Sequence, residues 1–135
     1  MFVQRGFAGP VVMLNLLKFR NVADYSGHPE LAPARPIGGA QACDRYVQHT
    51  LPYLRESGSD VLFLGAGGPF LIGPADERGD MAMLVRQASV TSFLSFASDE
   101  GYLAGLGHRT AGVEDSRLLP LSEMPFALSS DETGS

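Results

Sequence analysis

The feature that most constrains this chain is a run of apolar residues near its start. Every residue of Val11–Leu17 is apolar except Asn15, and Lys18 and Arg20 close the run. Such a run is too short to cross a bilayer, which needs about 20 apolar residues, but it suits a buried β-strand. Side chains alternate across a strand, so this strand is apolar on both faces. Both faces therefore need to be covered.

A change in hydrophobic period predicts a first helix from Gly39 to Glu56. Apolar residues recur there at spacings of three and four, which is typical of a helix with one face in the core. The predicted core-facing residues are Cys43, Val47, Leu51 and Leu54. Pro52 lies inside the helix and should kink it, and Gly58 should end it.

Later apolar runs predict the remaining strands and a second helix. The strands are Val61–Leu64, Met81–Val85 and Val113–Leu121, with Phe70–Ile72 as a short extended piece. Gly65–Gly68 should form a hairpin with close backbone approach, and it is not a dinucleotide-binding loop because no helix follows it. Ser89 should cap a helix that begins at Val90 and runs, with a break near Gly101, to about His108.

This order of elements, β-α-β-β-α-β, predicts an α+β, ferredoxin-like fold with an antiparallel sheet and two helices on one face. We expect one such domain over residues 1–121 and a polar C-terminal tail over 122–135. The other face of such a sheet normally meets water and carries alternating polar residues, but the apolar runs here do not alternate. A monomer would expose a large apolar patch, so we predict a homodimer packed sheet against sheet.

These segments also resemble an uncharacterised bacterial family, a domain of unknown function in the dimeric α/β-barrel superfamily. The opening strand, residues 13–20, carries the resemblance, which spans residues 10–121. The other similar segments are 46–53, 65–68, 83–86 before Ser89, Tyr102 with His108 and Arg109, and 115–120. The resemblance implies a dimeric α/β barrel. The superfamily includes cofactor-independent monooxygenases, haem-degrading enzymes, isomerases and stress-response proteins, so it implies a fold rather than a reaction.

Charge and cysteine content exclude several classes of function. The formal net charge is -5 at pH 7 and basic residues are scattered singly, whereas nucleic-acid-binding proteins show a basic patch or stripe. The one cysteine, Cys43, cannot form an intrachain disulfide, and the first residues lack the pattern of a signal peptide. We therefore expect a cytoplasmic protein that binds neither nucleic acid nor membrane.

The sequence predicts no cofactor. His28, His49 and His108 have no metal-ligand spacing between them, and one cysteine cannot build a zinc site. No glycine-rich loop leads into a helix, and no Cys-x-x-Cys-His site is present. We expect neither metal, haem nor nucleotide, and haem on His49 or His108 is the strongest alternative because a single axial histidine leaves no sequence signature.

The candidate site is a pocket between the sheet and the helices, roofed by the long, proline-rich loop Asn21–Gly39. The residues predicted for it are His49 as acid/base, Asn15 and Tyr46 as polar anchors, Arg86 or Arg109 as the partner of a substrate anion, and His28 reaching in from the loop. An imidazole with an ordinary pKa of about 6.5 is the best general base that these elements offer. Arginine is suited to binding a carboxylate.

Each of these residues also has a structural interpretation. Asn15 can satisfy the neighbouring backbone, Tyr46 and His49 can lie half-buried at a helix edge, and Arg109 can complement a helix dipole. Two functional classes stay open: a cofactor-free oxygenase or isomerase acting on a compact apolar or aromatic substrate, and a non-catalytic dimeric metabolite-binding or stress-response protein. A closed cavity lined by His49 and Asn15 favours the enzyme, and a cavity filled by Phe93, Phe96 and Leu51 favours the second class.

Overall fold

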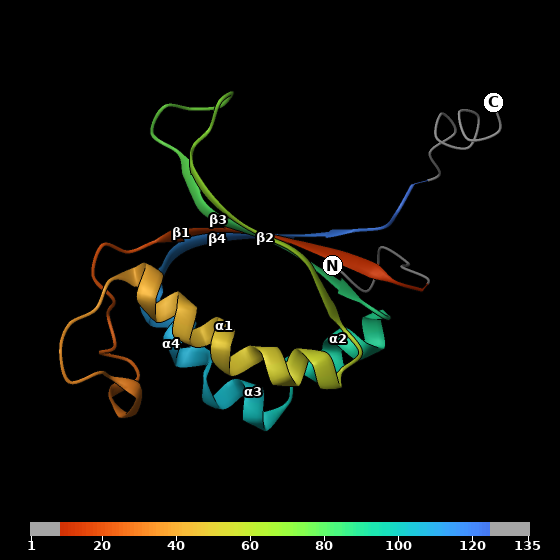
Figure 1. Ribbon diagram of the computed structural model, residues 1–135, viewed down its shortest axis with the longest axis horizontal. Coiled ribbons are helices and arrows are strands. Elements are labelled where there is room, and N and C mark those ends of the chain that lie inside the picture. The colour runs from red at the N-terminus through yellow and green to blue at the C-terminus, as the bar shows by residue number, and fades with distance from the viewer. Residues whose placement is uncertain (1–8, 125–135) are drawn as a thin grey trace.

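The computed structural model describes residues 9–124. Its elements are β1 (Val11–Phe19), η2 (Pro29–Leu31), α1 (Gly39–Glu56), β2 (Asp60–Pro69), β3 (Arg78–Gln87), α2 (Val90–Ala97), α3 (Glu100–Ala104), α4 (Leu106–Gly112) and β4 (Val113–Leu121). The strands form one sheet in the order β2-β3-β1-β4, and every neighbouring pair is antiparallel. The helices cover one face of this sheet and leave the other open (Figure 1). The predicted α+β class with an antiparallel sheet is confirmed.

The two faces of β1 have different surroundings, as the alternation of its side chains predicts. Val11, Met13 and Leu17 are at most 2% exposed and face the helices, with Asn15 on the same side. The main core forms between Val11 and Met13, two side chains of β3 and those of α1, α2 and α3, whereas Leu17 packs in a second cluster with Cys43. None of the helices within residues 9–124 is both long and apolar enough to cross a membrane.

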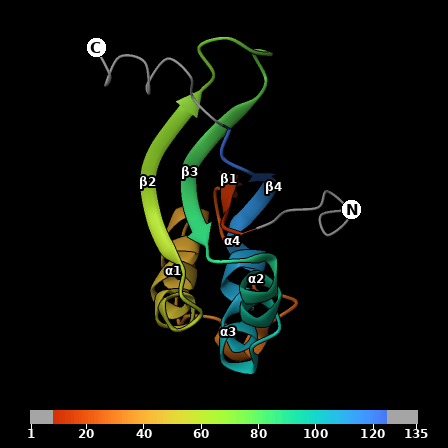
Figure 2. The ribbon, with the colours of Figure 1, turned by 90° about the vertical axis from the view of Figure 1, so that its right-hand side faces the viewer.

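The open face of the sheet carries an apolar row that crosses all four strands. Leu14 on β1 pairs with Leu84 on β3 and with Leu119 on β4, and Leu84 pairs in turn with Phe63 on β2. Directly paired residues share a face, so the four side chains form one line, called here the outer row. Phe63 is 55% exposed and Leu119 49% exposed. No element of the described chain covers this row (Figure 2).

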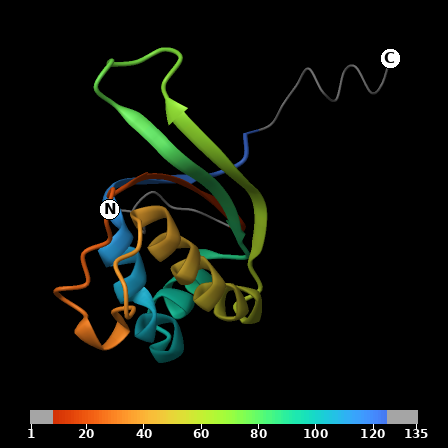
Figure 3. The same cartoon turned by 60° about the vertical axis from the view of Figure 1, so that its left-hand side comes forward.

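The predicted hairpin at Gly65–Gly68 is wrong, because these glycines are strand residues. β2 continues to Pro69 and β3 begins at Arg78, so the connection lies at residues 70–77 and projects beyond the sheet (Figure 3). A Cβ on Gly67 would collide with the carbonyl oxygen of Gly79. The glycines therefore allow the close backbone approach that was predicted, but between paired strands and not in a turn. Phe70–Ile72, predicted to be extended, falls in the connection.

Helix α1 has the predicted bounds, but its buried face differs from the predicted stripe. Its buried side chains include Cys43, Tyr46, Thr50 and Leu54, whereas Val47 and Leu51 are only half-buried. Tyr46 therefore lies in the core and not on a flank. The helix continues unbroken through Pro52 and ends before Gly58, whose φ of 81° is the left-handed conformation that favours glycine.

The predicted second helix is three helices, of which α2 begins at Val90 as expected. The Ser89 hydroxyl caps it by accepting a hydrogen bond from the Ser92 amide at 3.0 Å. Asp99 then caps α3, where its Oδ1 accepts hydrogen bonds from the amides of Gly101 at 2.8 Å and Tyr102 at 3.1 Å. These caps turn the chain twice, and the second turn brings Tyr102 under the sheet.

Removal of the Asp99 cap tests this arrangement of the three helices. Asp99→Ala is expected to lower the free energy of unfolding by about 1 kcal/mol, the usual effect of removing an N-cap. Glu100→Ala, at the exposed neighbouring acid, is the matched control and should change it much less. Urea denaturation compares the two, and equal midpoints would contradict the capping role of Asp99.

The long loop between β1 and α1 packs on α4, at the end of the molecule away from α2 (Figure 1). The Asp24 amide donates to the Ala111 carbonyl oxygen at 2.9 Å, and Tyr25 Oη lies 2.8 Å from His108 Nδ1 in a further hydrogen bond. Tyr25 forms a small core with Ala42 and Ala111. The loop is thereby held against the helices and does not extend under the sheet.

Candidate functional site

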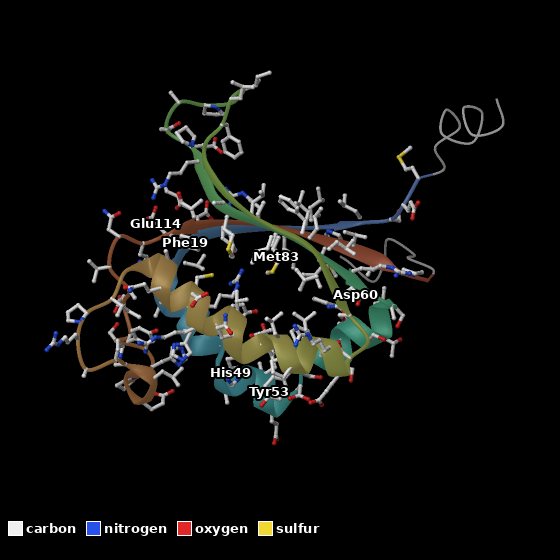
Figure 4. The ribbon with its side chains drawn as sticks, in the orientation of Figure 1. Phe19, His49, Tyr53, Asp60, Met83 and Glu114 are labelled. Atoms are coloured by element: carbon white, nitrogen blue, oxygen red, sulfur yellow. The ribbon has the colours of Figure 1, made fainter. Side chains whose placement is uncertain are left out.

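A cavity of about 280 Å³ lies between the sheet and the helices. Its walls are mostly apolar, with Met83 from β3 pointing from the sheet toward the helices (Figure 4). The polar side chains that line it are Asn15, Tyr46, Thr50, Gln87, Tyr102 and Arg109. The remaining wall includes Phe93, Phe96 and Ala97 of α2. These aromatic side chains line the cavity without filling it.

Two buried tyrosines meet at the cavity. The hydroxyl oxygens of Tyr46 and Tyr102 are 2.9 Å apart, and each residue is less than a tenth exposed. Burial raises the pKa of Tyr46 far above its usual range, and the neighbouring Tyr102 raises it further. The Tyr46 hydroxyl therefore stays protonated near neutral pH. One donates to the other, and the accepting hydroxyl keeps a hydrogen that it can donate elsewhere.

Arg109 brings the one positive charge found among the described lining residues. It projects from α4, is half-buried, and has neither an ion pair nor a hydrogen bond to any residue within 9–124. Its charge acts on Tyr46 and on Cys43, opposing the rise in pKa that burial causes at both. Burial still raises the pKa of Cys43 to about 11, so this thiol remains protonated.

Asn15 and Thr50 are polar lining residues with poorly satisfied side chains. The Asn15 amide nitrogen reaches the carbonyl oxygens of Met13 and Met83 only at 3.4 and 3.5 Å, which is long for a hydrogen bond. Thr50 is 3% exposed, and its hydroxyl has no hydrogen-bond partner in the described chain. It does lie close enough to the Tyr46 hydroxyl to lower the pKa of that tyrosine slightly.

Gln87 has a structural partner. It is 2% exposed, and its Oε1 accepts a hydrogen bond from the Ser59 hydroxyl, which lies 2.9 Å from the Ser57 hydroxyl. This chain of hydrogen bonds ties the end of β3 to the segment that follows α1. Gln87 therefore closes the cavity at that end and is less available to a ligand than Asn15 or Thr50.

His49 does not line the cavity. Its Nε2 lies 2.7 Å from the carbonyl oxygen of Gly101, and its ring lies 5.4 Å from that of Tyr53, between centroids. Figure 4 places His49 and Tyr53 on the side of α1 that faces away from the sheet. His49 packs against α3 so closely that a Cβ on Gly105 would collide with its ring. The structure therefore separates His49 from Asn15.

Arg86 and the loop residues also lie outside the cavity. Arg86 stands on the open face of the sheet, exposed, with Nη1 4.0 Å from an oxygen of Asp60. His28 packs over Gly107 and lies 3.7 Å from a carboxylate oxygen of Glu30. No residue of the loop lines the cavity. Of the six residues predicted for the site, the structure brings together Asn15, Tyr46 and Arg109.

Three polar lining residues were missed from the sequence as site residues: Thr50, Gln87 and Tyr102. Thr50 follows Tyr46 by four residues, so its place on the same helix face could have been read from the spacing. Gln87 follows Met83 and Val85 at strand spacing, so alternation places it on their face, whereas Tyr102 carries no comparable signal. No group of three or more metal-ligating His, Cys, Asp or Glu side chains occurs in the part of the chain that the structure describes.

Comparison with solved structures gives the class of the protein. A dimeric protein of unknown function and ferredoxin-like fold from Bacteroides fragilis is 11% identical, with a TM-score of 0.53 over 87% of this chain and 99% of that one. SnoaB, a cofactor-independent oxygenase from Streptomyces nogalater, is 10% identical, with a TM-score of 0.55 over 88% and 97%. At these identities the likeness is one of fold, and this chain is an α+β protein with a ferredoxin-like fold.

The family follows from a closer relative. Two crystal structures of the RPA0582 protein, a protein of unknown function from Rhodopseudomonas palustris, are 34% and 33% identical to this chain, one of them of the methylated protein. They match 92% of this chain and 90% and 92% of their own, with TM-scores of 0.79 and 0.77. The chain belongs to the family of this protein. No protein-family model and no curated protein matches it. The predicted membership in a family of unknown function is confirmed.

Proposed function

We propose that this protein is a sheet-to-sheet homodimer, a dimeric α/β barrel, in which each protomer binds one small apolar or aromatic molecule between its sheet and its helices. The observation that carries the proposal is the cavity, with mostly apolar walls and a few converging polar groups, as small-molecule sites generally have. Its volume is about 280 Å³. A dry cavity of about 150 Å³ can bind benzene, so this one has room for an aromatic ring with a short substituent.

The dimer is proposed from the outer row. Large apolar side chains on all four strands lie on the open face, and monomeric proteins rarely tolerate a patch of this kind. A second copy would cover the row with an identical row, as a two-fold interface requires. The β-α-β-β-α-β domain of residues 1–121 is the proposed unit of this dimer, and most of the predicted tail, 122–135, lies outside the described residues.

Binding is the favoured activity because the cavity lacks a general base. Among the described lining residues there is no His, Asp, Glu or Cys, and Tyr46 is held protonated by burial. Proton abstraction by this chain would need one of these groups within hydrogen-bond reach of the substrate. His49, the predicted base, is engaged with α3 instead.

A cofactor-free oxygenase or isomerase is the second candidate, favoured by the convergence of Arg109 with the two tyrosine hydroxyls. These donors could stabilise a negative charge that develops on an acidic substrate. SnoaB, which shares the fold, is a cofactor-independent oxygenase. A ligand that is recovered unchanged after aerobic incubation with the protein supports binding, and conversion of the ligand supports the second candidate.

Methyl NMR of methionine-labelled protein tests the proposed cavity site. Met13 and Met83 line the cavity, whereas Met81 packs beside Leu17 and Cys43, and Met124 is 78% exposed. Titration with toluene, an uncharged ring of suitable size, is expected to shift the Met13 and Met83 methyl signals and to leave the other two unchanged. Methionine-to-leucine variants assign the signals. Unchanged Met13 and Met83 signals at saturating toluene would contradict the proposal.

A further inference from the structure

We infer that the natural ligand of this cavity is a monocarboxylate, an aromatic or similarly compact apolar acid whose carboxylate binds Arg109. The inference rests on the proposed function and adds the chemical class of the ligand. It is carried by three observations on the cavity: a cation without an ion pair, buried hydroxyls beside it, and the position of the cation on a different helix from the phenylalanine side chains.

The unpaired cation is the first observation. Among the described residues, lysine and arginine form four ion pairs, through Lys18, Arg78, Arg86 and Arg117. Arg109 takes part in none of them, although it is half-buried in a mostly apolar cavity. A charge removed from water without a partner is costly, and a bound carboxylate would compensate it through two parallel hydrogen bonds.

The buried donors near Arg109 are the second observation. Thr50 is 3% exposed, and its hydroxyl makes no hydrogen bond of standard geometry although it acts on the pKa of Tyr46. The Tyr46–Tyr102 pair has one hydroxyl hydrogen left to donate. An ionised carboxylate accepts at about four lone-pair sites. It can therefore accept from the guanidinium group and from a hydroxyl at the same time. A neutral apolar ligand would leave the Thr50 hydroxyl unsatisfied.

The position of Arg109 relative to the phenylalanine side chains is the third observation. Arg109 comes from α4 and acts on Tyr46, whereas Phe93 and Phe96 come from α2, and Figure 1 shows α4 and α2 under opposite ends of the sheet. A ligand with an anionic end and an apolar end matches this arrangement. Arg109 is also the one Lys or Arg among the described lining residues, which favours a singly charged carboxylate over a doubly charged phosphate.

Isothermal titration calorimetry with phenylacetate and its neutral isostere phenylacetamide tests the inference on the intact protein. Wild type is expected to bind the acid at least about tenfold more tightly than the amide, the effect of one hydrogen-bonded charge. Arg109→Gln should reduce this ratio to about one, and Arg109→Lys should keep part of it because the charge remains. Arg35→Gln, at an exposed arginine of the loop, is the matched control and should keep the whole ratio.

The outcomes distinguish this inference from the proposed function. Equal affinity for acid and amide in wild type, or a preference that survives in Arg109→Gln, overturns the carboxylate assignment, and so does tighter binding of phenyl phosphate than of phenylacetate. Toluene shifts at Met13 and Met83 would leave the cavity site standing in each of these cases. The same shifts in Arg109→Gln show that the variant is folded, so that its loss of preference counts in favour of the inference.

Discussion

Leu14→Asp is expected to give a 14.4 kDa monomer in place of the proposed dimer. Leu14 occupies the outer row between Leu84 and Leu119, on the central strand pair of the open face. In the proposed dimer, an aspartate there would be buried against apolar side chains of the second copy. The penalty for burying an unpaired carboxylate is several kcal/mol per ion, and a two-fold interface incurs it twice.

Leu103→Asp is the control for this variant, because Leu103 is 43% exposed on α3, on the helical side of the molecule. It should leave the mass unchanged. Sedimentation equilibrium at micromolar concentration measures both variants and the wild type. A Leu14→Asp protein that associates as strongly as wild type would contradict the sheet-to-sheet dimer, and a wild type that is monomeric would contradict it directly.

Gly39→Ala is expected to lower the free energy of unfolding by about 3 kcal/mol, the upper part of the usual range for overpacking. Gly39 begins α1 where the ends of β1 and α4 also meet. An added Cβ would lie 2.6 Å from the Gly112 carbonyl oxygen and 2.7 Å from the Arg20 nitrogen, and it would also collide with the Arg20 carbonyl oxygen. All of these atoms are backbone, so no side chain can move aside.

The hydrogen bonds at this junction explain why Gly39→Ala should lose so much stability. The Gly39 amide donates to the Arg20 carbonyl oxygen at 3.1 Å, and the Arg20 amide donates to the Gly112 carbonyl oxygen at 2.9 Å. A backbone shift that relieves the clash would break one or both of these hydrogen bonds. Gly27→Ala is the control, because a Cβ there meets nothing within 4 Å. If urea denaturation puts Gly39→Ala within about 0.5 kcal/mol of Gly27→Ala, the described junction is wrong.

Two elements have the bounds that the sequence predicts, a helix with a long hydrophobic period and a strand that the polar residues 114–117 interrupt. Helix α1 and strand β4 have the predicted bounds. Gly65–Gly68 was misplaced because a glycine run is typical of a turn, and its role in the sheet depends on Gly79, a partner distant in sequence. The loop was misplaced for the same reason, since Tyr25 packs on α4 through contacts that no local pattern carries.

The site was harder to predict because it depends on the rotation of α1. Successive helix residues point about 100° apart, so Tyr46 and His49, three residues apart, can face one site or diverge. Here Tyr46 faces the sheet and His49 faces α3. Arg86 illustrates a clearer signal, because strand alternation places it opposite Val85 and Met83, which face the cavity. The sequence does not show which face of the sheet the helices cover. It therefore offers no reason to prefer Arg109 over Arg86 as the partner of a substrate anion.

Occupation of the cavity is the central claim, and a crystal of the protein grown with 4-bromophenylacetate tests it most directly. Bromine scatters anomalously, so its position can be found without interpreting weak density. We expect one anomalous peak per protomer inside the cavity, beside Phe96 and Met83, with the carboxylate at Arg109. A crystal at saturating ligand with no bromine in the cavity, and with side chains or water occupying that space, would contradict the claim.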